Sequence, residues 1–366
     1  MTSIIQDSLA IVAEKVRTGQ MSRRRFMHVL AALGAAGALP SWREANAQTK
    51  EIIFSMWGGD AEEVYRKAWG APYEEKAGVA IQFDGSGPTR GKIRAMVESK
   101  NVTWDVCDSG LGTQSSLGPE GLLEPIDYTI VDKNKIVPGL AYQWGATGYI
   151  YSSVLTWDSK AFGGEEPKTW ADFWDVKRFP GKRVVWKYMV GVLEAALIAD
   201  GVEPSKVYPI DMDRALNKIK ELKEHLVLWD NGASSQQVFR DGEVTMGQIW
   251  HTRSTMLADE SQGRFKYTFN QGIVQPGVWV VPKGNPAGKA VFEFLASMQE
   301  PEKQLILLKE LSQGPANPET AKLAPQLASK NPGSPENLAI QVFQNEEWYA
   351  KNHQEAEKRF LDVVSS

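Results

Sequence analysis

The feature that constrains the fold most is a repeated alternation of short apolar strands and amphipathic helical segments, which starts near residue 51. Residues 51–57 have the apolar character of a buried strand, and they run into the glycine pair Gly58 and Gly59. Residues 61–76 then show the apolar spacing of a helix. Units of this length, repeated along the chain, predict an α/β fold with a mostly parallel sheet and helices on both faces.

The same pattern continues to the end of the chain. We expect strands at 79–83, 104–108, 183–186, 247–250 and 278–282, a short element at 169–174, and helices at 89–98, 190–199, 212–226, 287–298, 301–311 and 346–363. In sheets of this kind, ligands bind beyond the carboxyl ends of the strands. The loops at 57–59, 84–89 and 108–110 are therefore the first places to look for a binding site.

Charge and cysteine content exclude several kinds of site. The first 47 residues carry six Lys/Arg and three Asp/Glu, so the remaining 319 residues have 35 basic and 42 acidic side chains and a net charge of −7. This acidic body argues against nucleic acid as a partner, because phosphate binding requires a basic surface. The single cysteine, Cys107, excludes an intramolecular disulfide and cysteine-cluster metal sites. Four scattered histidines offer no obvious ligand set, so neither a metal nor a cofactor is expected.

The first 47 residues have the features of an export signal. A short stretch contains Arg23, Arg24 and Phe26 and resembles the core of the twin-arginine signal. An apolar run that is too short to span a membrane follows, and small residues then predict cleavage after Ala47. We therefore expect the twin-arginine translocase to export the chain to the periplasm. A basic amphipathic helix at a membrane surface is the alternative interpretation.

The order of short motifs in the rest of the chain resembles the solute-binding proteins of ABC importers, in the branch that contains the spermidine and putrescine binders. The matching segments are 51–57, Trp104-Asp105-Val106, 143–148, 169–174, 241–250 and 278–282. The resemblance implies a type II periplasmic-binding-protein fold, with two α/β lobes that close around a ligand in the cleft between them. It also implies a monomer that captures a small solute without bond chemistry and delivers it to an ABC permease in the inner membrane.

The resemblance also suggests how the chain is divided. Residues 1–47 are the signal peptide, lobe one comprises 50–147 and 279–325, and lobe two comprises 148–278 and 326–366. We expect the chain to cross between the lobes near 145–149 and again near 272–278.

Three segments expected at the cleft lack the carboxylates of a polyamine site. Polyamine binders of this family pair ammonium groups with carboxylates and enclose the methylene chain between aromatic rings. The positions that match the family's Trp and Asp before the late strand are Gln275 and Gly277. The segment that matches its acidic cluster contains Lys187, and the third segment contains Arg253. We therefore favour a carboxylate, sulfonate, phosphonate or zwitterion with an apolar portion, and a polyamine remains the alternative.

The charged candidates suggest how such a ligand is held. Arg253 can hold an oxyanion with two hydrogen bonds, and Lys187 adds a point charge. A surface salt bridge is the alternative for the arginine, and a solvated strand end is the alternative for the lysine. Asp84 and Asp108 are the expected partners of an amine, although Asp84 also suits an Asx turn.

Aromatic and small polar residues complete the candidate site. Trp57, Trp144 and Trp250 follow or precede strands and offer flat apolar contacts, with core or hinge packing as the alternative. Turn residues can supply backbone N–H groups and hydroxyls to a bound anion. These remaining candidates are Gly58, Gly59, Ser86, Thr89 and Ser109, together with Tyr188 and Gln275.

An exported enzyme and a ferric-ion binder are the alternatives from other functional classes. The sequence has no metalloprotease, serine-hydrolase or phosphate-loop motif, and it has no adjacent pair of tyrosines of the kind that iron binders use. We therefore expect a binding protein without enzyme activity.

Overall fold

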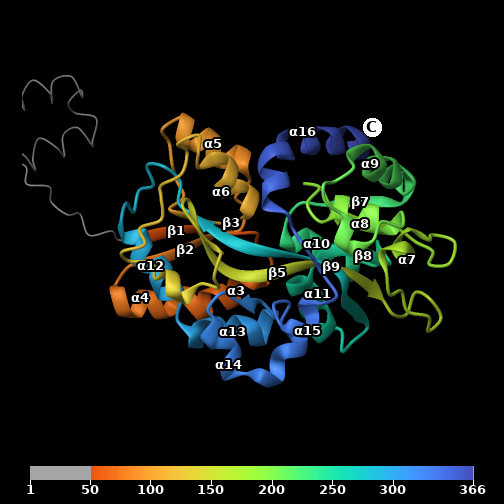
Figure 1. Cartoon of the computed structure of the whole chain (residues 1–366). Helices are drawn as coiled ribbons and strands as arrows, with labels where there is room; N and C mark the ends of the chain where they lie inside the picture. The colour runs from red at the N-terminus through yellow and green to blue at the C-terminus, as the bar shows by residue number, and fades with distance from the viewer. Residues whose placement is uncertain (1–50, 366) are drawn as a thin grey trace, which may run out of the picture. The chain divides into compact units, whose positions relative to one another are not determined.

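The expected alternation of strands and helices is present in the computed structural model, which describes residues 51–365 (Figure 1). The export signal predicted from Arg23, Arg24 and Phe26, and the predicted cleavage after Ala47, lie outside these residues. The described strands join in one sheet, with the order β2-β1-β3-β9-β5-β8-β6-β7 along its main path. Among residues 51–365, no helix combines the length and apolar character needed to cross a membrane.

The first half of the sheet is parallel. β1 (Glu51–Ser55) lies between β2 (Ala80–Asp84) and β3 (Val106–Gly110) and is parallel to both. The helices of this part are α3 (Ala61–Tyr65), α4 (Ala71–Ala77), α5 (Arg90–Glu98) and α6 (Leu111–Leu117). A π-helical turn, Arg66–Gly70, joins α3 to α4, so the helix expected over 61–76 contains a wider turn in its middle.

The second half repeats this arrangement. β6 (Arg183–Trp186) lies between β7 (Leu226–Trp229) and β8 (Met246–Trp250), again in parallel. Its helices are α7 (Trp170–Trp174), α8 (Val192–Ala199), α9 (Met212–Lys220), α10 (Gly232–Arg240) and α11 (His251–Glu260). Short strands with helices between them thus form both outer parts of the sheet. The prediction of one helix over 212–226 was wrong at its end: α9 stops at Lys220, a 3₁₀ turn follows, and residue 226 begins β7, which the sequence did not predict.

Two long antiparallel strands connect the halves. β5 (Gly145–Asp158) pairs with β9 (Phe265–Val280), and β9 also pairs with β3 while β5 pairs with β8. The segments expected to cross between lobes, 145–149 and 272–278, therefore lie within these two strands. The strand expected at 278–282 is the end of the 16-residue strand β9. Three two-residue strands pair with them: β4 (Ala141–Tyr142), β10 (Gly314–Pro315) and β11 (Val342–Phe343).

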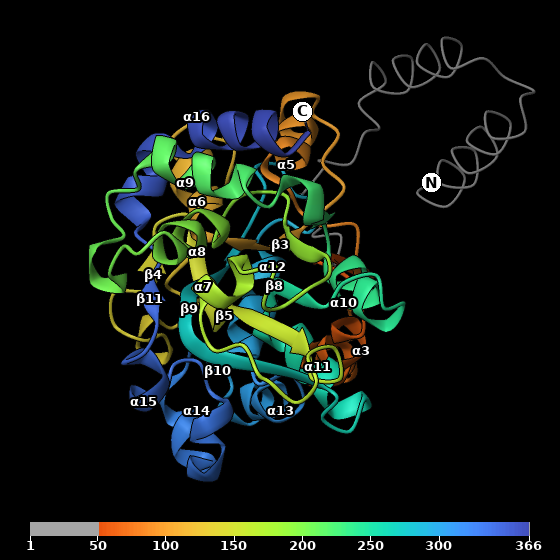
Figure 2. The same ribbon diagram turned by 90° about the vertical axis from the view of Figure 1, so that its right-hand side faces the viewer.

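The last third of the chain contributes helices to both halves. These helices are α12 (Ala290–Met298), α13 (Pro301–Leu311), α14 (Pro318–Leu323), α15 (Pro335–Leu338) and α16 (Glu346–Ser365). Figure 2 shows α16 beside α9, with α5 and α6 behind the same edge of the molecule. The C-terminal helix therefore lies close to elements from both halves.

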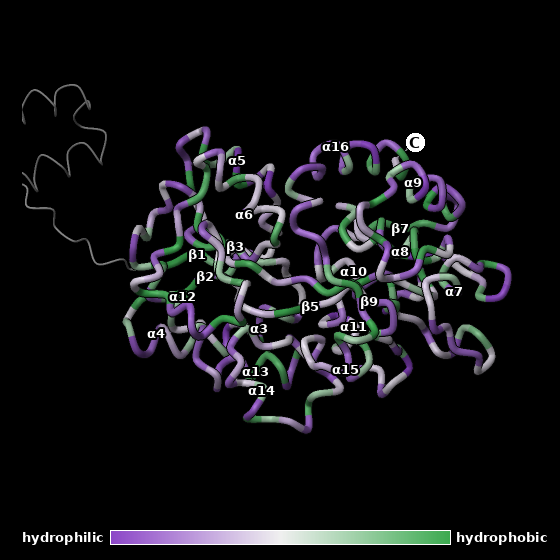
Figure 3. The backbone as a smooth tube through the Cα atoms, viewed as in Figure 1, coloured by the Kyte–Doolittle hydropathy of each residue, from purple (hydrophilic) through white to green (hydrophobic). Residues whose placement is uncertain are grey.

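Each half has its own hydrophobic core. Phe54, Trp69 and Phe294 belong to the core of the first half, whereas Trp170 and Phe360 belong to that of the second half. Figure 3 shows the hydrophobic residues along β1 and β7, while α16 is largely hydrophilic. Phe360 places one face of α16 in the second core, so this helix packs with the second half.

A close approach inside β5 makes one glycine critical for stability. A Cβ added at Gly148 would lie 2.1 Å from the ring of Trp279, which is only 1% exposed. We expect Gly148→Ala to lower the free energy of unfolding by about 1–3 kcal/mol, because the core must repack around an added methyl group. Chemical denaturation measures this, with Gly91→Ala in α5 as the control, since a Cβ there meets nothing within 4 Å. Equal loss of stability in both variants would contradict the packing argument.

Candidate ligand-binding site

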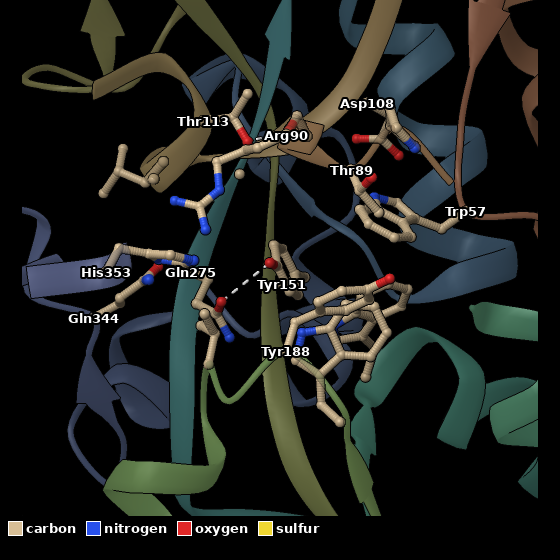
Figure 4. A pocket seen from close by; sticks show the side chains of 18 of the residues that line it. Trp57, Thr89, Arg90, Asp108, Thr113, Tyr151, Tyr188, Gln275, Gln344 and His353 are labelled. Atoms are coloured by element: carbon tan, nitrogen blue, oxygen red, sulfur yellow. Dashed lines mark hydrogen bonds between the residues drawn. The ribbon is translucent and has the colours of Figure 1, made fainter. Parts of the chain in front are cut away.

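A cavity of about 370 Å³ lies where elements of the two halves meet (Figure 4). Its lining comes from β3, β6 and β8, from the central strands β5 and β9, from helices α5, α6 and α11, and from the C-terminal segment after residue 343. The carboxyl ends of parallel strands converge here, as expected for this class of sheet. Pockets of about 300–1,000 Å³ are typical sites for small molecules.

The cavity brings together eight of the fourteen residues that the sequence suggests for ligand binding. They include both kinds of charged group and two of the three tryptophans. The eight are Trp57, Thr89, Asp108, Ser109, Tyr188, Trp250, Arg253 and Gln275.

Four other candidates lie in turns next to the cavity but do not line it. The carbonyl oxygen of Gly58 accepts a hydrogen bond from Arg253, and Gly59 packs closely against the start of α10. Asp84 accepts hydrogen bonds from the indole of Trp104 (2.7 Å) and from the backbone N–H of Ser86 (2.8 Å). These contacts correspond to the Asx turn considered as the alternative for Asp84.

The last two candidates, Trp144 and Lys187, also lie outside the cavity lining. Trp144 packs over Gly118, where an added Cβ would lie 2.3 Å from the indole ring. The Nζ of Lys187 lies 2.9 Å from the carboxylate of Asp230, so its charge already has a partner near the surface. Both positions correspond to the structural alternatives of core packing and a solvated strand end.

Asp108 is a buried carboxyl group in the cavity wall. It lies near the end of β3, is 2% exposed, and accepts hydrogen bonds from the hydroxyls of Tyr149 (2.8 Å) and Tyr65 (3.3 Å). Burial raises the pKa of Asp108 to about 7, although the two tyrosines and the charge of Arg253 act in the opposite direction. A carboxylate can accept about four hydrogen bonds, so this group retains acceptor capacity for a ligand.

Arg253 places a guanidinium in the same cavity. It lies in the first turn of α11, and side chains of a helix tilt toward its N-terminus, here toward the end of β8. The side chain is buried; its Nη2 donates to the carbonyl of Gly58 (2.8 Å), and its Nε has no hydrogen-bond partner among residues 51–365. Burial lowers its pKa, and no carboxylate of the described chain lies within 4.0 Å of it.

The space for this guanidinium depends on Gly232 at the start of α10. A Cβ at that position would lie 2.3 Å from the Nε of Arg253. The N–H of the same glycine donates to the carbonyl of Trp57 (2.8 Å), which links the second half of the sheet to the first. The arginine is therefore enclosed by backbone from both halves.

Aromatic rings form one wall of the cavity. Trp186 packs against Trp57, Trp250 and Tyr188, with ring centroids 5.4, 5.1 and 4.9 Å apart. Trp186 and Trp250 are the last residues of the parallel neighbours β6 and β8, and Trp57 follows β1 in the other half. Because the rings pack on one another, they present a continuous apolar surface suited to the hydrocarbon part of a ligand.

Several lining residues were not predicted from the sequence. Tyr65, Tyr149 and Trp186 surround the charged groups or extend the aromatic wall. Tyr151 donates a hydrogen bond to the side-chain oxygen of Gln275 (3.1 Å), and the amide of Gln275 donates to Ser153 (3.2 Å). Tyr149 and Tyr151 lie two apart on β5 and therefore share one face of that strand, which the sequence analysis did not identify as a strand.

The C-terminal segment adds further unpredicted residues to the cavity. The cavity is lined by Gln344, just before α16, and by His353, Glu357 and Leu361 on that helix, while Arg90 and Thr113 line it from the first half. Nothing local in the sequence relates α16 to α5, because their contact depends on the complete fold.

The described chain offers no metal centre. Within residues 51–365, no group of three or more His, Cys, Asp or Glu side chains could hold a metal ion. Cys107 is buried, and burial raises its pKa well above the usual value.

The chain is similar to known proteins both in sequence and in structure. The family model for bacterial extracellular solute-binding proteins matches residues 68–335. The gamma-aminobutyric acid-binding protein of Pseudomonas aeruginosa is 29% identical over 350 residues, which cover 93% of this chain and 97% of that protein.

Two solved structures are also similar over most of their length. The structure of the Atu4243-GABA receptor is 33% identical, with a TM-score of 0.75, and covers 86% of this chain and 97% of its own. The periplasmic binding protein MotA of A. tumefaciens B6, solved with glucopine, is 31% identical, with a TM-score of 0.80, and covers 86% and 99%.

Proposed function

The chain belongs to the bacterial extracellular solute-binding protein family, and from this premise we propose that it captures a small zwitterion, with a carboxylate, an ammonium group and an apolar portion, for uptake by an ABC permease. One observation carries the proposal: a buried carboxyl group, Asp108, and a buried guanidinium, Arg253, line the same cavity beside an aromatic wall. The matched family and relative are named as binding proteins, which supports the proposal that this chain binds its solute without bond chemistry.

The ligand's carboxylate is assigned to Arg253. A buried cation is costly unless an opposite charge and hydrogen bonds compensate it, and within the described chain this guanidinium has one strong hydrogen bond and an unpartnered Nε. The planar fork of arginine suits two hydrogen bonds to a carboxylate. A ligand carboxylate would therefore supply the missing charge and accept from the terminal nitrogens, of which Nη1 has only a 3.5 Å contact with the hydroxyl of Thr252.

The ligand's ammonium group is assigned to Asp108. The tyrosine hydroxyls that donate to this carboxyl hold it in place, and an added cation would favour its ionised form. The hydrocarbon portion then lies against Trp57, Trp186 and Trp250. A polyamine suits this cavity less well, since a second ammonium group would approach Arg253.

The relatives support the same ligand class. Two of them are named for gamma-aminobutyric acid, a compound that carries one carboxylate and one ammonium group. At identities of 29% and 33%, the names indicate a class of ligand for this chain and leave the compound itself to experiment.

Capture is proposed to occur by closure of two lobes, 50–147 with 279–325 and 148–278 with 326–366. The separate hydrophobic cores of the two halves support this division, and the long strands β5 and β9 are the connections about which the lobes would turn. Contacts such as Arg253 with the carbonyl of Gly58 would form on closure.

We further propose that the protein works in the periplasm as a monomer. The twin-arginine motif with Arg23, Arg24 and Phe26, and cleavage after Ala47, would bring it there through the twin-arginine translocase. Membership of an extracellular solute-binding family supports an extracytoplasmic location.

Calorimetric titration of residues 48–366 with compounds of four or five carbons tests the proposed ligand class. The set is 4-aminobutyrate and L-norvaline as zwitterions, butyrate and butylamine with one charge each, and putrescine with two positive charges. We expect at least one zwitterion to bind about 10–100 times more tightly than either singly charged compound, because each charged hydrogen bond contributes about 1.5–3 kcal/mol. Tighter binding of putrescine than of both zwitterions would refute the assignment.

A further inference from the structure

The cavity extends beyond the groups assigned to the zwitterion. On the side of Tyr151 away from Trp57 and Asp108, Figure 4 shows Arg90, Thr113, Gln344 and His353. Glu357 on α16 also lines the cavity. We call these side chains the outer polar end of the cavity: Arg90, Thr113, Gln344, His353 and Glu357.

The charges at the outer polar end cancel one another. The Nη2 of Arg90 lies 3.2 Å from the carboxylate of Glu357, and the two side chains are 20% and 26% exposed. Because each group already has its opposite charge, neither needs a charged ligand. A second carboxylate on the ligand would approach Glu357, and a second ammonium group would approach Arg90.

His353 provides an unpartnered polar atom at this end. Its side chain is 11% exposed. Its Nδ1 has no hydrogen-bond partner among residues 51–365 but lies against Gly112, where an added Cβ would be 3.4 Å away, so Nε2 is the ring atom left for a ligand. Burial and the nearby charge of Arg90 lower its pKa to about 2, so the imidazole is neutral. Its Nε2 is 3.8 Å from the Glu357 carboxylate, which is too long for a hydrogen bond. A neutral imidazole carries one donor and one acceptor, so it suits an uncharged polar partner.

The neighbouring side chains are also neutral hydrogen-bonding groups. Thr113 accepts a hydrogen bond from the hydroxyl of Ser109 (2.7 Å), which leaves its own proton to donate. Gln344 is half-buried, and its carboxamide can both donate and accept. The outer polar end thus offers donors and acceptors without net charge.

We infer that the outer polar end binds a neutral hydrogen-bonding extension of the ligand, so that the substrate class is an amino acid whose far end carries an amide or hydroxyl group. The inference rests on the proposed function, since it takes the zwitterionic groups to occupy Asp108 and Arg253. It narrows the class, because plain apolar, dicarboxylic and diamino acids would leave these groups unsatisfied or oppose their charges.

Four α-amino acids with the same five-carbon chain test this preference, together with a longer derivative. They are L-glutamine with an amide, L-norvaline with a methyl group, L-glutamate with a carboxylate and L-ornithine with an ammonium group; N5-(2-hydroxyethyl)-L-glutamine extends the amide. We expect at least one of the two amides to bind about ten times more tightly than norvaline, glutamate and ornithine in calorimetric titration.

Variants identify the outer polar end as the source of the preference. In His353→Leu, we expect the ratio of amide to norvaline affinity to fall to about threefold or less. Asn352→Leu, at an exposed position next to it on α16, is the control and should keep the wild-type ratio. Melting temperatures without added compound show whether each variant is folded. Thr113→Val is a second test of the same affinity ratio, and it replaces His353→Leu if that variant does not fold.

The outcomes separate this inference from the proposed function. If norvaline, glutamate or ornithine binds as tightly as the amides, or if only 4-aminobutyrate binds, the inference is wrong while the zwitterion site stands. An amide preference that survives both His353→Leu and Thr113→Val also overturns it. If no zwitterion binds, the proposed function fails and this inference fails with it.

Discussion

Replacing Arg253 with methionine is expected to weaken zwitterion binding by at least about 100-fold. Truncating one member of a buried, hydrogen-bonded charge pair costs about 2–5 kcal/mol, and 2.7 kcal/mol corresponds to about 100-fold. The variant would leave a ligand carboxylate in the cavity without a counter-charge, since Lys187 is paired with Asp230 outside the lining. Calorimetric titration with the tightest zwitterion of the panel measures the loss.

Two further variants distinguish loss of the contact from loss of the fold. Arg253→Lys keeps the charge but not the planar fork, so we expect an intermediate loss of about tenfold. Arg264→Met removes a partly exposed arginine that pairs with Asp158 and lies outside the cavity, so its affinity should stay within twofold of wild type. A methionine variant that folds normally and binds zwitterions as well as wild type would remove Arg253 from the site.

Local patterns predicted β1, β2, β3, β6, β8 and most helices, but neither the edge strand β7 nor the full length of the central strands. β6 and β8 are short apolar runs with clear ends, and the sequence places both within one residue of their observed bounds. β9 contains Gln271, Gly272 and Gln275, which interrupt the apolar run, so only its end at 278–280 reads as a strand. Long-range pairing with β3 and β5 makes it one strand, and pairing of that kind leaves no local signal.

The sequence predicted those site residues whose positions follow from the order and direction of the strands. Trp57 and Asp108 lie at or near the ends of the parallel neighbours β1 and β3, and the rule for parallel sheets groups them. Trp250 ends β8, which runs in the opposite direction in the other half, so only the two-lobed arrangement implied by the family resemblance brings it to the same cavity. Trp144 satisfied the same reasoning but packs over Gly118, and no local pattern reveals that neighbour. Residues of α16 were missed because they reach the cavity only through packing of the whole second half.

Arg253 and Lys187 show the same limit for charges. Both are cations that follow a strand of the second half, so the sequence makes both candidates for contact with an anionic group of the ligand. In the structure, Asp230 lies 2.9 Å from Lys187, whereas the buried Arg253 has no carboxylate within 4.0 Å in the described chain. A partner that is 43 residues away along the chain decides between a surface salt bridge and a binding group.

Replacing Asp108 with asparagine is expected to weaken zwitterion binding by at least about 30-fold while making the protein more stable. The substitution removes the counter-charge for the ammonium group, a charge-assisted contact of about 2 kcal/mol or more. It also removes a buried carboxyl group whose desolvation opposes folding when it is ionised. An increase in stability together with a loss of binding is typical of a residue retained for function.

The pH dependence of binding gives this prediction a second readout. With the pKa of Asp108 at about 7, the carboxyl group is protonated below that pH and must lose its proton to hold an ammonium group. Wild-type affinity should therefore fall as pH decreases below 7, approaching about tenfold per pH unit, while the ligand's own groups do not titrate between pH 5 and 8. The Asp108→Asn variant should show a flat profile, and a sloping one would assign the titration to another group.

Stability has the opposite pH dependence, and its sign follows from the same shift. The pKa of Asp108 is raised from 3.8 to about 7 on folding, so between these values the folded protein holds a proton that the unfolded chain has lost. Raising the pH through this range therefore destabilises the wild type relative to Asp108→Asn, by up to about 1.4 kcal/mol per unit, and the difference becomes constant above pH 7. Chemical denaturation at several pH values measures it.

Asp105, three residues earlier, is the matched control for these experiments. It is also buried, with a raised pKa, but it accepts hydrogen bonds from the backbone N–H groups of Ile53 (2.7 Å) and Ala287 (2.6 Å) and does not line the cavity. Asp105→Asn should lower stability, because the two backbone N–H groups can only donate and one of them would face the NH₂ of the new amide. The tyrosine hydroxyls around Asp108 can instead accept from an amide, so Asp108→Asn escapes this cost. Zwitterion affinity should be unchanged in Asp105→Asn. If the two variants behave alike, Asp108 is a structural carboxyl group and the ammonium site lies elsewhere.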